Sequence, residues 1–205
     1  LNGSFEEYSV CPKYNGQLYL ANGWYNPTIA SPDLYHVCSN TGNHSDAGVP
    51  KHPGGYQFPH SGEGYGAFIP SSWPASHPGK NNYREYISTK LLAPLAKGKK
   101  YCVTMYIAIS KSTKYAIDQL SVYFSKDSVY QYTSECLANV TPQLNNLPGV
   151  YLDDTTRWQK ITWEYQADDA YQWMTIGNFN DYDHTQAVLL RNIPDMDCTP
   201  SYYYV

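Results

Sequence analysis

The chain has 205 residues, a formal net charge of −4, and 16% aromatic residues, including 22 tyrosines. Only 16% of its residues are charged, well below the content of an ordinary soluble domain. No basic face is apparent, which disfavours nucleic acid as a partner because phosphates need neutralisation. The apolar stretches are too short to span a bilayer, so membrane insertion through a helix is excluded.

The predicted elements are strands. Residues 1–80 are interrupted by turn residues, and we expect only short strands there, near Gly3–Tyr8, Leu34–Cys38 and Gly64–Phe68. After Asn81 apolar and polar residues alternate in runs that are rich in β-branched and aromatic side chains, a pattern that predicts strands. These runs are Tyr83–Leu91, Lys100–Ser110, Gln119–Ser125, Gln159–Gln166, Trp173–Phe179 and Tyr202–Val205. Asp127–Leu137 is the one segment compatible with a helical turn.

No linker or repeat divides the chain, so we expect a single domain over residues 1–205. Many strands without intervening helical periodicity favour an all-β fold, an antiparallel β-sandwich.

The five cysteines indicate an oxidising compartment. None forms a CxxC pair, which disfavours zinc. Cys102 lies within an alternating run, and we expect a buried free thiol there. The other four lie in turn-rich segments, and of their three pairings we favour Cys11–Cys38 with Cys136–Cys198. The alternative is four unpaired thiols in a reducing compartment.

The motifs of catalysis are absent. The sequence has no GxSxG elbow and no HExxH helix. Carboxylate pairs such as Glu85 with Asp118 or Glu164 exist, but an ion pair between Arg84 and Glu85 is the simpler interpretation. We therefore expect no enzymatic activity.

Nine short motifs follow one another in a specific order. They are Asn2-Gly-Ser-Phe-Glu-Glu-Tyr8, Asn22-Gly-Trp24, Pro32-Asp33, Gly48-Val-Pro50, Gly55-Tyr-Gln57, Asn82-Tyr-Arg-Glu-Tyr-Ile87, Gly98-Lys-Lys-Tyr-Cys-Val103, Tyr115-Ala-Ile-Asp118 and Thr175-Ile-Gly-Asn-Phe179. Together they resemble a family of secreted and cell-envelope β-sandwich modules of Bacteroidota. Members of that family often precede an OmpA-like domain or a type IX secretion sorting domain.

The resemblance implies a jelly roll similar to galactose-binding-like and carbohydrate-binding modules, secreted or held at the outer-membrane surface. It also implies a structural calcium ion between the opening segment, where Glu6 matches the acidic position, and the final strand. In the family the final strand usually continues into two aspartates, whereas the sequence here stops at Val205. Either the calcium site lacks that carboxylate or the protein is longer.

The residues themselves indicate glycan binding. Sugar rings stack on aromatic side chains, and their hydroxyls need amide, carboxylate or guanidinium partners. The candidate ligand-binding residues in loops are Trp24, Tyr56, Gln57, Trp73, Tyr83 and Arg84. The alternative is that most of these rings only pack the sandwich.

Two further expectations concern the surface. Exposed tyrosines suit protein interfaces, so the alternative function is a structural subunit or adhesin of an envelope assembly, with another cell-surface protein or a second copy as partner. The triplets around Ser128 and Thr155 resemble the O-glycosylation sequon of Bacteroidota envelope proteins, and we expect sugar on these two side chains.

Overall fold

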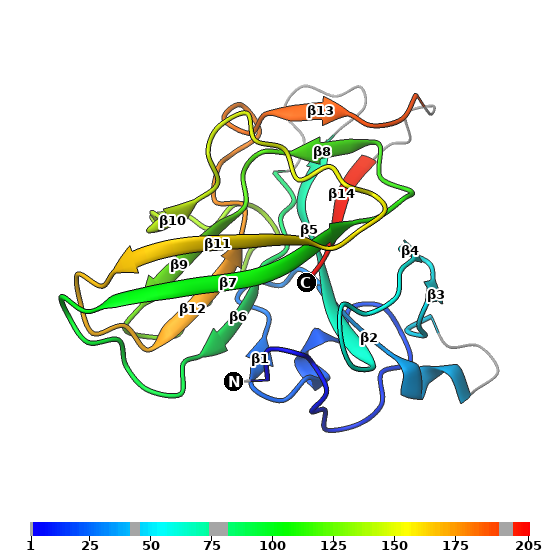
Figure 1. Cartoon of the computed structure of the whole chain (residues 1–205), viewed down its shortest axis with the longest axis horizontal. Helices are drawn as coiled ribbons and strands as arrows, with labels where there is room; N and C mark the ends of the chain where they lie inside the picture. Colours follow the sequence, from blue (N-terminus) through cyan, green and yellow to red (C-terminus); the bar gives the residue numbers. More distant parts are fainter. Residues whose placement is uncertain (1, 42–45, 74–81, 193–198) are drawn as a thin grey trace.

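The computed structural model describes residues 2–41, 46–73, 82–192 and 199–205. The described strands form two antiparallel sheets of five strands each, and Figure 1 shows their arrangement. Sheet A has the order β1-β6-β12-β9-β10, and sheet B has the order β11-β7-β14-β5-β2. The remaining described strands form the small β3-β4 hairpin and a two-stranded sheet in which β13 pairs with β8.

The strands of sheet A are β1 (Trp24–Tyr25), β6 (Ile87–Lys90), β9 (Ser121–Ser125), β10 (Leu144–Asn145) and β12 (Trp173–Gly177). Those of sheet B are β2 (Asp33–His36), β5 (Gly64–Trp73), β7 (Lys100–Ile109), β11 (Gln159–Gln166) and β14 (Thr199–Tyr204). The hairpin comprises β3 (Lys51–His52) and β4 (Gly55–Tyr56), and the two-stranded sheet comprises β8 (Tyr115–Ile117) and β13 (Ala187–Leu189). Two 3-10 turns, η1 (Leu18–Leu20) and η2 (Val37–Thr41), lie near the first strands.

The main core lies between the two sheets. Leu34, Phe68, Ile107 and Tyr203 enter it from sheet B, and Ile87, Val122 and Ile176 are among those that face them from sheet A. Phe124 of β9 stacks on Tyr165 of β11, with ring centroids 5.0 Å apart. Successive long strands β5, β6, β7, β9, β11, β12 and β14 alternate between the sheets. This alternation confirms the antiparallel β-sandwich of the jelly-roll type.

The strands predicted after Asn81 are confirmed, and Gln159–Gln166 coincides with β11. The expected strand at Gly3–Tyr8 is wrong, because only an isolated bridge joins Tyr8 to Ala21. Phe5 has a φ of 60°, and the Asn2 side chain bonds both the amide and the carbonyl of Glu7. This segment is therefore a side-chain-capped turn rather than an extended strand.

Asp127–Leu137 contains no helical turn. Its backbone groups bond outward: the Gln131 amide donates to Pro27, and the Ser134 carbonyl accepts from Arg84. Because these groups are satisfied by distant segments, no local i to i−4 pattern is needed.

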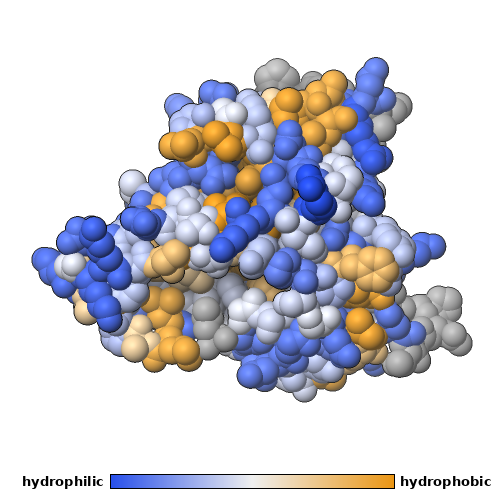
Figure 2. All heavy atoms as spheres, viewed as in Figure 1, coloured by the Kyte–Doolittle hydropathy of each residue, from blue (hydrophilic) through white to orange (hydrophobic). Residues whose placement is uncertain are grey.

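The outer face of sheet B carries a second, aromatic core. Tyr35, Tyr65, Tyr202 and Tyr204 lie beneath the segment that contains the β3-β4 hairpin. His52 of β3 stacks on Tyr35 at 3.7 Å and bonds the Tyr65 hydroxyl at 2.9 Å. Along β7 and β11 the outer side chains are mainly polar, as Figure 2 shows. The aromatic layer therefore covers only part of the outer face.

The predicted disulfide Cys11–Cys38 is confirmed, with the two Cα atoms 6.0 Å apart. Cys102 is free, but the expectation that it is buried is wrong, because its position on β7 faces solvent. The expected bond from Cys136 is not formed. Its free thiol donates to the Asn180 carbonyl at 3.0 Å, and Cys198 lies outside the described residues. Within the described ranges no helix has the length and apolar character needed to cross a membrane.

Replacing Cys11 and Cys38 by serine should lower the free energy of unfolding by roughly 2–4 kcal/mol, since the bond closes a loop with a sequence separation of 27 residues. Urea denaturation monitored by tryptophan fluorescence measures the change. The matched control is Cys102→Ser at the exposed free thiol, which should leave stability within about 0.5 kcal/mol. Equal stability of the double variant and the parent would contradict the expectation.

Candidate functional site

A cavity of about 350 Å³ lies at one end of the outer face of sheet B. We call it the carboxylate cavity. Asp33 enters it from β2, Ile69 from β5 and Tyr202 from β14, while Tyr83 and Glu85 come from the segment before β6. The complete lining is Asn15, Ser31, Asp33, Ile69, Tyr83, Glu85, Pro200 and Tyr202. A volume of this size falls within the range of small-ligand sites.

Asp33 is buried and held by protein donors on both carboxyl oxygens. The Gly16 amide donates to Oδ1, and the hydroxyls of Tyr35 and Tyr202 donate to Oδ2. Burial raises the pKa of Asp33, while the three donors oppose that shift. The side chain therefore occupies the cavity wall in a fixed orientation.

Glu85 is also buried and hydrogen-bonded. The Ile69 amide donates to Oε2 at 2.8 Å, and the Tyr83 hydroxyl donates to Oε1 at 2.7 Å. Burial and the charge of Asp33 raise the pKa of Glu85 to about 8. The two carboxyls therefore interact across the same cavity.

The expected ion pair between Arg84 and Glu85 is wrong. Adjacent residues of an extended segment point to opposite sides, and Arg84 is fully buried on the side away from the cavity. Its guanidinium donates to the carbonyls of Tyr83 and Asn180. Among the described residues that line the cavity, none carries a cationic side chain.

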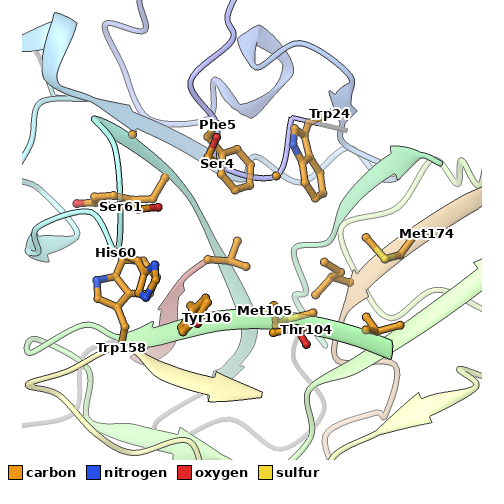
Figure 3. Close-up of a pocket in the computed structure, with 16 residues that line it drawn as sticks. Ser4, Phe5, Trp24, His60, Ser61, Thr104, Met105, Tyr106, Trp158 and Met174 are labelled. Carbon is orange, nitrogen blue, oxygen red and sulfur yellow. The ribbon is translucent and has the colours of Figure 1, made fainter. Parts of the chain in front are cut away.

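A second pocket, of about 290 Å³, lies between β7 and the N-terminal segment. Figure 3 shows Trp24, Phe5 and Met174 on one side, and His60, Tyr106 and Trp158 on the other. His60 stacks on Tyr106 at 3.6 Å, and Trp24 stacks on Phe5 at 4.9 Å. β14 pairs with one edge of β7 at Ala108 and Ile109. Before Ala108 that edge of β7 has no partner among the described strands, and the pocket lies beside this stretch.

Among the described residues that line this second pocket, none is acidic, and its deeper walls belong to the core between the sheets. It offers hydroxyls from Ser4, Ser61 and Thr104, whereas the carboxylate cavity adds two buried carboxyls with shifted pKa values. The carboxylate cavity is therefore the better candidate site for a polar ligand.

The six candidate ligand-binding residues do not lie together. Tyr83 lines the carboxylate cavity, whereas Trp24 lines the second pocket and is only 7% exposed. Tyr56 is 50% exposed and packs edge-on against Phe58, and Gln57 bonds the Phe58 carbonyl. Arg84 lines neither cavity, and the side chain of Trp73 lies outside the described residues.

Sequence reasoning missed Asp33, Glu85 and Tyr202 as members of one site. On β2, Asp33 and Tyr35 alternate with Leu34, and all three are buried. An acidic residue within a buried strand is the sequence signal that could have identified this site. Nothing in the sequence places β14 close to β2, because β5 separates them in the sheet.

Glu6 lies in a cluster with His36 and Glu63, whose ligand atoms are within 4.8 Å of one another. Glu6 Oε1 accepts from the amides of Glu63 and Gly64. His36 Nδ1 accepts from the Cys38 amide, so its neutral ring carries the proton on Nε2, which faces Glu6 Oε2 at 3.8 Å and is no ligand. Calcium takes six to eight oxygen ligands, of which Glu6 and Glu63 would supply carboxylate oxygens, and the calcium ion stays a prediction.

The two expected glycosylation sites lie in loops. Ser128 is exposed, and Thr155 is half-buried beside Asp154, whose carboxylate accepts from the Thr156 and Arg157 amides. Sugar on these two side chains stays a prediction.

No family model and no curated protein matches the sequence. Among solved structures, the chain is similar to the CBM22-1 xylan-binding domain from Paenibacillus barcinonensis Xyn10C, with a TM-score of 0.48 and 10% identity over 98% of this chain and 86% of that chain. A structure described as "CBM4 structure and function" gives 0.39 and 16% identity over 100% and 93% of the two chains. The CBM22-1 and GH10 modules of Clostridium thermocellum xylanase 10B, complexed with xylohexaose, give 0.37 and 14% identity over 97% and 27%. At these scores the likeness carries no argument about the ligand.

The pKa of Glu85 predicts a pH dependence of stability. The folded protein keeps this proton up to about pH 8, whereas an unperturbed glutamate has a pKa near 4.5. The unfolded chain therefore binds fewer protons between these values, so the free energy of unfolding falls as the pH rises.

Burial lowers the pKa of His52 to about 4. This shift makes the free energy of unfolding rise with pH, but only below the ordinary histidine pKa of 6.5. Urea titrations at about pH 6.5, 7.5 and 8.5 therefore isolate the carboxyl. In the Glu85→Gln variant the free energy of unfolding should fall less steeply with pH than in the parent protein. An equal slope in the variant and the parent would exclude Glu85 as the source of the pH dependence.

Proposed function

We propose that this chain is a non-catalytic carbohydrate-binding module that acts outside the cytoplasm, secreted or displayed at the outer-membrane surface. The observation that carries the proposal is the carboxylate cavity, where two tyrosine rings and several hydrogen-bonding groups converge. Convergent polar groups with shifted pKa values in one cavity are typical of a binding site.

The chemistry of the cavity suits a sugar. The rings of Tyr83 and Tyr202 can contact C–H faces, and the Asn15 amide and Ser31 hydroxyl can bond ring hydroxyls. A carboxylate has about four acceptor directions. Three donors reach Asp33 and two reach Glu85, so each carboxyl keeps at least one direction for a ligand.

Binding fits this arrangement better than hydrolysis. Glycoside hydrolases also use two carboxyls, but one must donate a proton and the other must attack the sugar or activate water. Here every carboxyl oxygen already accepts a hydrogen bond from the protein. Groups held in this way orient a ligand and are poor nucleophiles.

The disulfide supports the proposed compartment. The Cys11–Cys38 bond joins two loop segments, and such structural bonds persist in oxidising environments. A module outside the cytoplasm would also meet polysaccharides directly.

Tyr83→Ala should weaken glycan binding by about tenfold or more, because the side chain supplies both a ring and the hydroxyl that holds Glu85. Affinity electrophoresis against a panel of soluble polysaccharides measures the loss. Tyr83→Phe separates the two contributions by keeping the ring. The matched control is Tyr132→Ala, at a loop tyrosine that is 86% exposed and lines neither cavity. Absence of binding to the whole panel, or equal loss in the control, would overturn the proposal.

One observation favours the second candidate function, a subunit of an assembly or an adhesin. Tyr130 and Tyr132 are 62% and 86% exposed, and large exposed rings are enriched at protein interfaces. Sedimentation velocity over about a hundredfold concentration range should then show association that the Tyr130→Ser, Tyr132→Ser double variant loses. A sedimentation coefficient that stays at the monomer value over the whole concentration range would exclude self-assembly.

A further inference from the structure

The carboxylate cavity has a charge imbalance. Asp33 and Glu85 are only 4% and 2% exposed, and both face the same cavity. Burying carboxyls is costly unless charged or hydrogen-bonding partners compensate. Protein hydrogen bonds compensate in part, but no lysine, arginine or histidine lies among the described lining residues.

We propose that this cavity selects sugars that carry a protonated primary amine, such as glucosamine units without an acetyl group. The inference rests on the proposed function and names the ligand class of the same site. No described residue of the lining supplies a positive charge to the two carboxyls, and the ammonium of the ligand would supply one.

The remaining acceptor directions fit an ammonium group. An ammonium has three N–H donors, and Asp33 and Glu85 each keep at least one acceptor direction. Tyr83 and Tyr202 line the same space, and aromatic rings attract cations. An ammonium can therefore satisfy both carboxyls while the sugar ring packs on a tyrosine.

The same geometry discriminates between related sugars. An N-acetyl group is neutral, so it leaves the two carboxyls without a counter-charge. A uronic acid would bring a third carboxylate toward Asp33 and Glu85, and like charges in a desolvated site repel. The order of affinity should be amine first, acetamide second and uronate last.

Proton release gives a second readout. Without a ligand, burial and Asp33 hold the pKa of Glu85 at about 8, so this carboxyl is largely protonated near neutral pH. A bound ammonium favours the ionised form and displaces that proton. A neutral sugar places no charge beside Glu85 and should release no proton.

The experiment is isothermal titration calorimetry at about pH 5.5, where the glucosamine amines and the Glu85 carboxyl both carry their protons before binding, in two buffers of different ionisation enthalpy, with hexamers of glucosamine, N-acetylglucosamine and galacturonic acid as probes. We expect the glucosamine hexamer to bind about tenfold tighter than the acetylated hexamer, with a buffer-dependent enthalpy that reports proton release. Raising NaCl from about 0.05 to 0.5 M should weaken binding of the glucosamine hexamer more than binding of the acetylated hexamer.

Glu85→Gln keeps the shape of the side chain and removes its charge, so it should abolish both the amine preference and the proton release. Asp33→Asn should lose the preference as well, and Tyr132→Ala should change neither. The thermal melting temperature of each variant establishes that it is folded. If either variant fails to fold, the two-buffer and salt comparisons on the parent chain decide.

The outcomes separate the two claims. Tight binding of the acetylated hexamer without proton release, lost in Tyr83→Ala, would overturn the amine preference and leave the glycan-binding module standing. Preference for the uronate would likewise overturn the inference alone. If these hexamers and the polysaccharide panel all fail to bind, the proposed function itself falls.

Discussion

The burial of Asp33 is the constraint on which the outer layer depends. Its carboxyl lies on β2, and the Tyr202 hydroxyl reaches it from β14 across the intervening strand β5. Ala67 lies opposite both Asp33 and Tyr204 in the ladders, and its small side chain leaves room above β5. Because a buried carboxyl must keep its donors, the three strands, the Gly16 loop and the aromatic layer are held together.

The unusual tyrosine content has a structural explanation in this layer. A tyrosine can bury its ring and still offer a hydroxyl, so it fills a core that also contains carboxyls. Tyr35 and Tyr202 bond each other at 2.7 Å as well as Asp33, and Tyr65 bonds His52. Phenylalanine would leave these polar groups without partners. The same hydroxyls place Glu85 and Asp33 at the wall of the cavity, and so connect the packing of the fold to its proposed recognition of sugars.

The interior and the cavity show different degrees of predictability. Strand β11 and its neighbours in sequence were predictable because alternation reports which face of a strand is buried. Cys102 was misjudged because alternation alone does not say which of the two sets faces the core. Arg84 and Glu85 were expected to form an ion pair, but consecutive residues of an extended segment point to opposite sides. Arg84 is therefore buried away from the cavity, and Glu85 lines it.

The sequence by itself determined the all-β class and the long strands after Asn81, since both are encoded in local alternation. It favoured the Cys11–Cys38 bond among three pairings, and the tertiary structure decided that pairing by bringing the two segments together. Only the tertiary structure decided that Asp33, Tyr83, Glu85 and Tyr202 share one cavity. Those residues come from three segments that meet because sheet B orders its strands β14-β5-β2, and strand order depends on packing of both sheets rather than on any local pattern. The acidic character of the described cavity lining, on which the proposed ligand class rests, is therefore a property of the fold.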